Sequence, residues 1–182
     1  LKKGFFSPKE CEDIIAIAET YKSNHSTMGY EKPEEEDADQ SYSHRDSFIN
    51  WIPQDMSIPV LERFWKKYEE VITEVNHNLW GFDLHCMFEQ AQFTRYGVKG
   101  HFDYHMDLGK GQMCLRKVSV VTLLSDPSEF EGGDFQFFKA RNVKLEQGDT
   151  VVFPSYLLHR VTPLTSGMRK SIVLWAGGSY YK

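Results

Sequence analysis

Two segments in the first half of the chain have helical periodicity. After Ser7, apolar residues recur every three or four positions up to about Lys22, and Ser7-Pro8-x-Glu10 has the form of a helix start with a capping box. The second segment, residues 57–79, has an apolar stripe along one face and ends before Gly81, a residue type that commonly terminates helices. We therefore expect two amphipathic helices, the second longer than the first.

The second half of the chain has a different pattern. Short runs of β-branched and aromatic residues alternate with turns rich in Gly, Asp and Pro, and these runs span residues 84–96, 118–124, 135–138, 150–153, 160–162 and 170–175. Many short strands at this spacing predict a sandwich or a barrel. Helices followed by strands predict an α+β fold, in which two N-terminal helices buttress a jelly-roll-like double sheet.

The organisation predicted from this pattern is a single domain over residues 1–182. We see no internal repeat and no linker, so a helical part of about 1–80 and a β core of about 81–182 share one unit. Residues 23–47 include an acidic run at 31–39, which favours a surface loop, with a lid or substrate-docking loop as the alternative. If this loop meets the substrate, its charge favours a basic or neutral partner. Residues 48–52 resume a strand pattern.

Composition narrows the classes of protein. With 41% hydrophobic and 26% charged residues, the chain is typical of a folded globular protein, and its net charge of −5 argues against nucleic-acid binding. No apolar run approaches the roughly 20 residues that span a bilayer, so we expect no membrane segment. Three cysteines without a C-x-x-C pair, together with no visible signal peptide, predict reduced thiols and a cytoplasmic location. The aromatic share of 14% predicts a thick core and rings for a pocket.

Histidine and aspartate stand two positions apart twice, as His101/Asp103 and His105/Asp107. Residues two apart on a strand face the same side, so either pair could grip a metal from adjacent corners. Both pairs have the same parity and lie about 13 Å apart along a strand at about 3.3 Å per residue, so spacing alone does not choose between them. His159, from a distant strand, would complete a site of two histidines and one carboxylate, which suits non-haem Fe(II) with open positions.

Arg169 follows His159 across a turn and can therefore lie on a neighbouring strand, deeper in the same pocket. A guanidinium there could hold a carboxylate by two parallel hydrogen bonds. Arg169, Ser171, Val173 and Trp175 alternate onto one face, which would give the pocket a charge, a hydroxyl and an aromatic wall.

Taken together, these motifs resemble the Fe(II)/2-oxoglutarate dioxygenases, in particular the prolyl-4-hydroxylase-like group. The resemblance covers about residues 84–176. It rests on Tyr96-x3-Gly100-x-Phe102-x-x-His105-x-Asp107, Glu131-Gly132-Gly133-Asp134-Phe135, Gly148-Asp149, Phe153-Pro154, His159-x-Val161-x-Pro163 and Gly167-x-Arg169-x-Ser171. It implies a double-stranded β-helix of the jelly-roll or cupin type.

The resemblance also implies the iron ligands. In the family pattern the metal-binding H-x-D follows the aromatic residue after the glycine, which selects His105 and Asp107, with His159 as the third ligand. His101 and Asp103 then become wall residues near the mouth of the site, or surface residues.

The co-substrate site follows from the same resemblance. Arg169 is implied to hold the distal carboxylate of 2-oxoglutarate, where many prolyl hydroxylases use Lys; Tyr96 is implied to line this site, and Ser171 to add a hydroxyl. By strand parity and motif position, we expect Trp175 to face the iron pocket. The implied cofactors are Fe(II), 2-oxoglutarate and O2, with ascorbate as an optional reductant.

The implied activity couples 2-oxoglutarate decarboxylation to hydroxylation of a substrate. A prolyl residue in a peptide or protein is the first expectation. A small molecule such as a free amino acid is the alternative, and a non-catalytic, cupin-like metal-binding module is a third.

Overall fold

The computed structural model describes residues 1–29, 43–140 and 142–181, so the acidic run at 31–39 lies outside the described residues. The helices are α1 (Pro8–Ala18) and α2 (Pro59–Val75). The first strands are β1 (Ser23–Gly29), β2 (Ser43–Ile52), β3 (Leu84–Cys86), β4 (Ala91–Tyr96), β5 (His101–His105) and β6 (Arg116–Leu123). They are followed by β7 (Phe130–Gly132), β8 (Phe135–Phe137), β9 (Asn142–Val143), β10 (Thr150–Pro154), β11 (His159–Val161), β12 (Leu164–Gly167) and β13 (Arg169–Gly178).

Both predicted helices are present. The capping box of α1 is formed, because the Ser7 hydroxyl accepts a hydrogen bond from the Glu10 amide while the Glu10 carboxylate accepts one from the Ser7 amide. This helix ends at Ala18, earlier than expected. A π-helical turn over Asn76–Trp80 extends α2 to Gly81, whose φ of 62° terminates it. No helix in the described ranges is long and apolar enough to cross a membrane.

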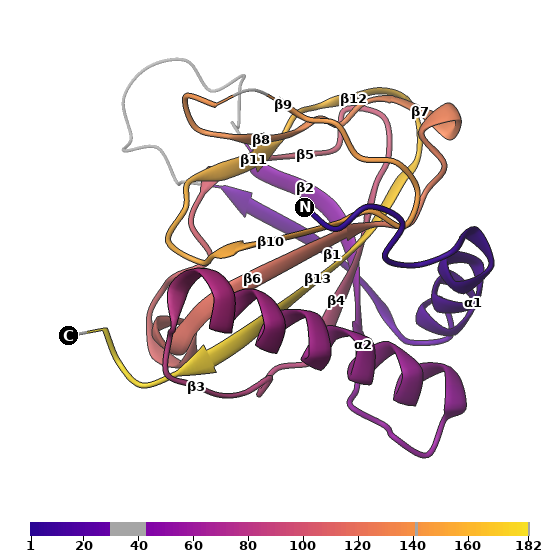
Figure 1. Ribbon diagram of the computed structural model, residues 1–182. Coiled ribbons are helices and arrows are strands. Elements are labelled where there is room, and N and C mark those ends of the chain that lie inside the picture. The colour runs from indigo at the N-terminus through magenta and orange to yellow at the C-terminus, as the bar shows by residue number, and fades with distance from the viewer. Residues whose placement is uncertain (30–42, 141, 182) are drawn as a thin grey trace.

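The strands pair antiparallel in a sheet that folds over on itself. Among the described residues the order is β10-β6-β13-β4-β2-β5-β11-β8-β9, with β1 on β2, β3 on β13, and β12 paired separately with β7. Strand β2 belongs to both halves, since Ile49 pairs with Thr94 of β4 while Arg45 pairs with Phe102 of β5. As a result β5, β11, β8 and β9 lie over β10, β6, β13 and β4 (Figure 1).

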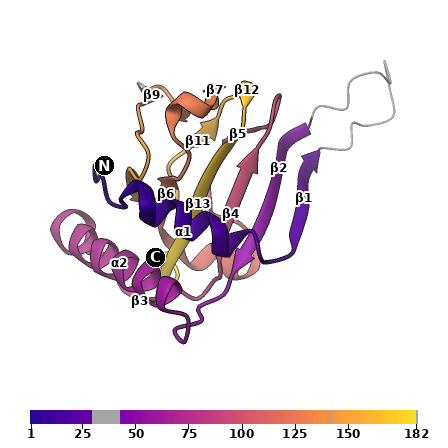
Figure 2. The same ribbon diagram turned by 90° about the vertical axis from the view of Figure 1, so that its right-hand side faces the viewer.

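The helices cover the outer face of the larger half. Figure 2 shows β6, β13, β4, β2 and β1 side by side with α1 crossing in front of them. Alternate residues of β6 divide between the two sides: Val118 and Val120 pack with the helices, whereas Ser119 and Val121 face the other half of the sheet. Tyr68 of α2 fixes this packing with a 2.7 Å hydrogen bond to Thr122.

The N-terminal half is less helical than predicted. Residues 23–29 and 43–52 form β1 and β2, whereas the sequence predicts a loop over 23–47 and a strand only from residue 48. The inward side chains at the start of β2 include Arg45 and Ser47, which are buried but polar. Because of them, the alternation of apolar and polar residues that marks a strand is absent from the sequence there.

The N-terminal residues are fastened to the turn before β10. The Phe6 amide donates to the Gly148 carbonyl at 3.1 Å, and buried Asp149 accepts hydrogen bonds from Lys3 and the Gly4 amide. Gly148 has φ +81°, and a Cβ there would lie 1.8 Å from the Phe6 carbonyl oxygen. Only glycine fits this approach.

Candidate metal centre and its cavity

Three side chains converge between the two halves of the sheet. His105 ends β5, Asp107 follows it, and His159 begins β11, directly opposite His105 in the strand register. Each histidine Nε2 lies 3.7 Å from one oxygen of Asp107, and the three candidate ligand atoms all lie within 4.8 Å of one another. Two imidazoles and one carboxylate in this arrangement match the donor set of mononuclear non-haem iron sites.

Both imidazoles are oriented by the backbone. The Nδ1 atoms of His105 and His159 lie 2.8 Å from the carbonyl oxygens of Asp103 and Leu157, respectively. When Nδ1–H donates to these carbonyls, the Nε2 lone pair of each ring is left free and directed at Asp107. The geometry therefore sets the tautomer that a metal ion requires.

The carboxylate of Asp107 is also held in place by hydrogen bonds. Asp107 Oδ2 accepts a 2.6 Å hydrogen bond from the buried hydroxyl of Ser119, which is also 2.9 Å from the hydroxyl of Ser155. The Asp107 amide donates to the Ser155 carbonyl. Burial opposes ionisation of Asp107, but the two histidines and the Ser119 hydroxyl outweigh it and hold the pKa below its usual value. Asp107 is thus a carboxylate at neutral pH.

Burial lowers the pKa of His105 to about 3, and the nearby His159 acts in the same direction against the attraction of Asp107. A neutral imidazole is the form that binds metals. The ring of Phe102 lies against His105 with the two ring centroids 3.4 Å apart and nearly parallel, which accounts for part of this burial.

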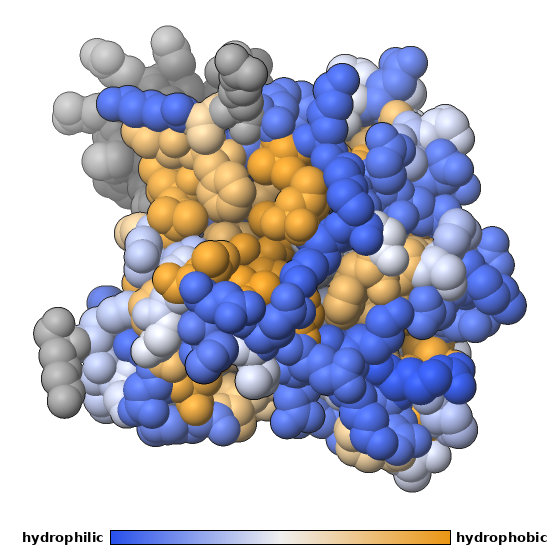
Figure 3. Space-filling view, viewed as in Figure 1, coloured by the Kyte–Doolittle hydropathy of each residue, from blue (hydrophilic) through white to orange (hydrophobic). Residues whose placement is uncertain are grey.

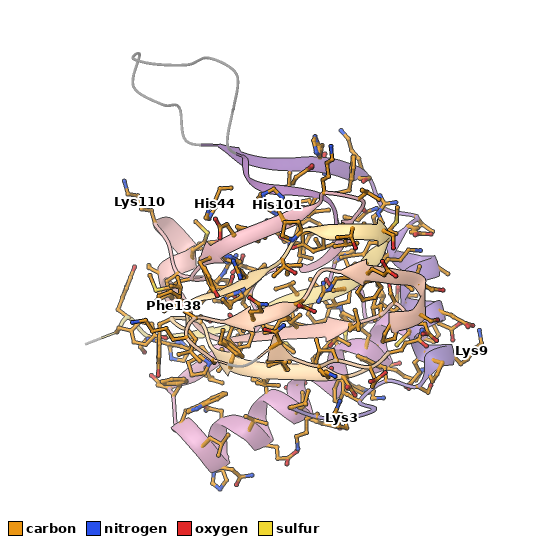
Figure 4. All side chains as sticks on the ribbon, turned by 90° about the horizontal axis from the view of Figure 1, so that it is seen from above. Lys3, Lys9, His44, His101, Lys110 and Phe138 are labelled. Carbon is orange, nitrogen blue, oxygen red and sulfur yellow. The ribbon has the colours of Figure 1, made fainter. Side chains whose placement is uncertain are left out.

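His101 and Asp103, expected either on the wall near the mouth of the site or on the surface, are half-buried and are not among the residues that line the cavity. Val161 of β11 pairs with Phe102 and His159 pairs with His105, so β5 carries one extra residue over this stretch. This bulge reverses the alternation, which puts Phe102 and His105 on the inner face. His101 pairs with Asp46 beyond the bulge, and Figure 4 shows His101 towards the side of the molecule opposite Lys3. Equal parity of His101, Asp103, His105 and Asp107 would hold only in a strand with an unbroken period of two.

The cavity around the triad has a volume of about 790 Å³. The four residues of β13 that were predicted to share one face all line this cavity: Arg169, Ser171, Val173 and Trp175. The predicted co-substrate residue Tyr96 lines it as well. Tyr96 pairs with Arg169 in the register of β4 and β13, and the guanidinium lies 5.8 Å from the Tyr96 ring centroid. The structure thus brings the predicted co-substrate residues into the same cavity as the triad.

Arg169 is 2% exposed, and its Nη1 donates a 3.0 Å hydrogen bond to Ser171. Within the described part of the chain, no carboxylate forms an ion pair with it. Burial lowers its pKa, but Arg remains charged, and a buried guanidinium requires an anion to offset its desolvation. The distal carboxylate of 2-oxoglutarate fits this requirement.

Sequence reasoning missed two further arginines in this cavity. Arg45 of β2 is buried, its Nε donates to Ser47 at 2.8 Å, and its guanidinium lies 4.6 Å over the Phe102 ring. No pattern in the sequence marks Arg45, because the acidic run in residues 23–47 predicts a surface loop there.

Arg116 of β6 is the other. It forms a bidentate ion pair with Glu89 and lies 3.6 Å over the Trp175 ring. It also donates to the Asp107 carbonyl at 3.1 Å, so this network supports the backbone beside a candidate ligand. No local motif marks Arg116, since its partners come from three other segments.

The cavity opens beside apolar side chains. Met106, Leu108 and Met113 line it, and Met106 and Met113 are exposed to solvent. Apolar side chains also gather on the face over β5, β8, β10 and β11 (Figure 3), where Phe138, at the end of β8, is exposed. An entrance of this kind suits a substrate with an apolar part.

Comparison with known proteins identifies the class. Residues 91–177, which contain the three converging side chains and Arg169, match the family model of the 2OG-Fe(II) oxygenase superfamily. This segment of the chain belongs to that superfamily, as the resemblance implied. The family takes its name from the two groups its members use, 2-oxoglutarate and Fe(II).

The individual relatives with similar sequences are PKHD-type hydroxylases, and the similarity covers part of each protein. A PKHD-type hydroxylase of Stenotrophomonas maltophilia (strain R551-3) is 35% identical over 92 residues, which are 46% of this chain and 41% of that protein. Another, from Pseudomonas fluorescens (strain Pf-5), is 27% identical over 133 residues, 68% of this chain and 55% of that protein. The chain therefore matches only about half of the length of these curated relatives.

Solved structures extend the likeness to the whole fold. A prolyl-4-hydroxylase of Pseudomonas putida superposes with a TM-score of 0.73 at 19% identity, covering 98% of this chain and 91% of that one. A prolyl hydroxylase of Trichoplax adhaerens, in complex with a peptide fragment of the hypoxia inducible factor oxygen degradation domain, gives 0.70 at 17% identity, covering 96% and 81%. The predicted double-stranded β-helix with supporting helices is thereby confirmed.

Proposed function

We propose that this protein is an Fe(II)- and 2-oxoglutarate-dependent hydroxylase that acts on a prolyl residue in a peptide or protein. The observation that carries the proposal is the convergence of His105, Asp107 and His159 in one cavity with the buried guanidinium of Arg169, which forms no ion pair with any carboxylate of the described residues. A metal site alone would need no such cation, and an anion site alone would need no imidazoles.

In this proposal His105, Asp107 and His159 hold Fe(II). Arg169 and Ser171 bind the distal carboxylate of 2-oxoglutarate, beside Tyr96. When bound, these two groups would supply the oxidising chemistry together with O2: one oxygen atom of O2 ends in succinate as 2-oxoglutarate loses CO2, and the other enters a C–H bond of the substrate.

The protein's own part is to orient the candidate iron ligands and to exclude water from the cavity. The carbonyls of Asp103 and Leu157 keep both Nε2 atoms available, and Ser119 keeps Asp107 in place. Phe102 and Trp175 supply apolar cavity wall, which limits the entry of water.

The prolyl assignment is supported by the two solved structures described above, both of which are named prolyl hydroxylases and one of which is in complex with a peptide. The open, partly apolar entrance at Met106 and Met113 is consistent with an extended chain. A free amino acid is the second candidate.

The test is formation of succinate from 2-oxoglutarate by the protein with Fe(II), followed by mass spectrometry of Pro-containing peptides. We expect turnover in the wild type, its loss in His159→Ala, and wild-type turnover in His77→Ala, which alters an exposed histidine outside the cavity. A gain of one oxygen on proline supports the substrate class. Turnover with no oxygen gained by any peptide, but with hydroxylation of free amino acids, would favour the second candidate. No turnover with Fe(II) would refute the hydroxylase itself.

A further inference from the structure

The glycine pair Gly132-Gly133, which connects β7 to β8, borders the buried Arg169. Both glycines line a second cavity of about 340 Å³, and Arg169 lines this cavity as well as the one that holds the triad. Among the described lining residues, the two glycines belong to the second cavity only. Arg169 therefore forms part of the wall between the two cavities, with the glycine pair on the side away from the triad.

Gly133 lies unusually close to the side chain of Arg169. A Cβ atom on Gly133 would lie 3.0 Å from Arg169 Cδ and 2.7 Å from Leu164 Cδ1. Carbon atoms in ordinary contact are about 3.5–4.0 Å apart. Any residue larger than glycine would therefore have to displace these two side chains, both of which are buried.

The turn that carries Gly133 is fastened to the connection between β11 and β12. The Gly133 amide donates a 3.3 Å hydrogen bond to the Pro163 carbonyl. The next residue, Asp134, is joined to Thr162 twice, because its amide donates to the Thr162 hydroxyl at 2.8 Å and its carbonyl accepts from the Thr162 amide at 3.0 Å. An added methyl group would therefore be accommodated by the side chains it meets and not by withdrawal of the backbone.

The direction of this displacement follows from the side on which Gly133 lies. Since Gly133 approaches Arg169 from the second cavity, a methyl group there would press the Arg169 side chain towards the triad. A 2-oxo diacid that reaches from the triad to Arg169 has to match the span between them. Pressing Arg169 inwards would shorten this span.

We propose that Gly133 is a positioning residue that sets the length of the co-substrate: the absence of its side chain lets Arg169 lie deep enough for 2-oxoglutarate and not for the shorter oxaloacetate. This inference rests on the proposed function and deepens it, since it assigns to one residue the choice among 2-oxo diacids. Gly133 acts here through Arg169, and it lies outside the lining of the cavity that holds the triad.

The experiment measures binding of 2-oxoglutarate and of freshly dissolved oxaloacetate to the Mn(II)-loaded protein by calorimetry, without a substrate to hydroxylate. One methylene group more or less in a fitted pocket is worth about 10- to 200-fold, so the wild type should bind 2-oxoglutarate at least about tenfold more tightly than oxaloacetate. In Gly133→Ala we expect the Kd of 2-oxoglutarate to rise about tenfold and that of oxaloacetate to change by less than about threefold, since only the longer diacid is compressed. The affinity for Mn(II) should stay unchanged.

Gly81→Ala is the matched control. Gly81 has φ +62°, close to the +65° of Gly133, but a Cβ atom on Gly81 would meet no atom of the described residues within 4 Å. The variant therefore introduces the same left-handed backbone strain without the contact with Arg169. Its ratio of the two dissociation constants should equal that of the wild type.

A second variant guards against loss of folding. Leu164 Cδ1 is the atom that the new methyl group would meet first, and Leu164→Val removes it. The double variant Gly133→Ala/Leu164→Val should therefore melt higher than Gly133→Ala and show the same shift in the ratio, because the contact with Arg169 remains. Leu164→Val alone should keep the wild-type ratio.

The outcomes separate this inference from the proposed function. A wild-type ratio in folded Gly133→Ala, or an equal loss of affinity for both diacids, would overturn the inference and leave the 2-oxoglutarate site in place. Failure of both Gly133 variants to fold would also overturn it, because Gly133 would then serve the fold alone. Absence of 2-oxoglutarate binding by the wild type would refute the proposed function itself.

Discussion

Replacing Ser119 by Ala tests how the candidate metal site is held in place. The Ser119 hydroxyl is fully buried on β6 and donates a 2.6 Å hydrogen bond to Asp107 Oδ2. Its removal leaves that oxygen without this donor and takes away the contact that fixes the rotation of the carboxylate. The substitution removes a single atom, so the core around Val118 and Val120 keeps its shape.

The expected loss of stability follows from the negative charge of the acceptor, Asp107. A hydrogen bond to a charged group contributes about 1.5–3 kcal/mol. For a domain of this size, each kcal/mol lost lowers the melting temperature by about 2–4 °C. Loss of a group that orients a metal ligand typically weakens metal binding by about 10- to 100-fold. We therefore expect Ser119→Ala to melt several degrees lower without metal and to bind a divalent metal at least tenfold more weakly.

The assay is a titration of the metal-free protein with Mn(II), followed by electron paramagnetic resonance of the free ion, with melting measured in parallel. Ser155→Ala is the control, because its hydroxyl contacts Ser119 and not Asp107; its metal affinity should stay within about threefold of the wild type. If Ser119→Ala binds Mn(II) as tightly as the wild type does, the argument that this hydroxyl preorganises the carboxylate is refuted.

Three further outcomes are expected. Arg169→Met should raise the KM for 2-oxoglutarate at least tenfold while leaving Mn(II) affinity unchanged, and an unchanged KM would place the distal carboxylate elsewhere. Because the pKa of His105 is lowered to about 3 in the folded state, the unfolded chain takes up the proton first, so the metal-free protein should lose up to about 1.4 kcal/mol per pH unit below about pH 6.5; urea unfolding should show a smaller slope in His105→Gln, and an equal slope would contradict this. Gly148→Ala should destabilise the protein strongly in urea, since its Cβ would meet the Phe6 carbonyl; a midpoint equal to the wild type would show that the N-terminal segment moves aside freely.

Periodicity within a single segment correctly predicts secondary structure and the orientation of side chains. The capping box at Ser7 and the apolar stripe of residues 57–79 predict the two helices, because both signals are local. The alternation along β13 likewise predicts which of its side chains face the cavity, since the strand pairs regularly and keeps a period of two from Arg169 to Trp175.

Features that depend on pairing between distant strands were not predictable. The bulge in β5 has no mark in the sequence, and His101 and Asp103, expected either near the mouth of the site or on the surface, are not among the residues that line the cavity. Arg45 was missed because a strand with polar residues on its buried side has no apolar alternation. The resemblance to a known family selected the pair His105/Asp107, which spacing alone left open, and the structure brings that pair together with His159.

The extra residue in β5 also bears on how the chain tolerates insertions and deletions. Deleting one residue between Phe102 and His105 would restore regular pairing with β11 and turn either His105 or Phe102 towards solvent. Substitutions there can be absorbed, but a change of length cannot, since it exchanges the inner and outer faces of the strand. A loop grafted between related proteins would therefore have to keep the length of residues 102–105, and a graft that shortens this stretch by one residue would turn either His105, a member of the triad, or Phe102 to the wrong side of the sheet.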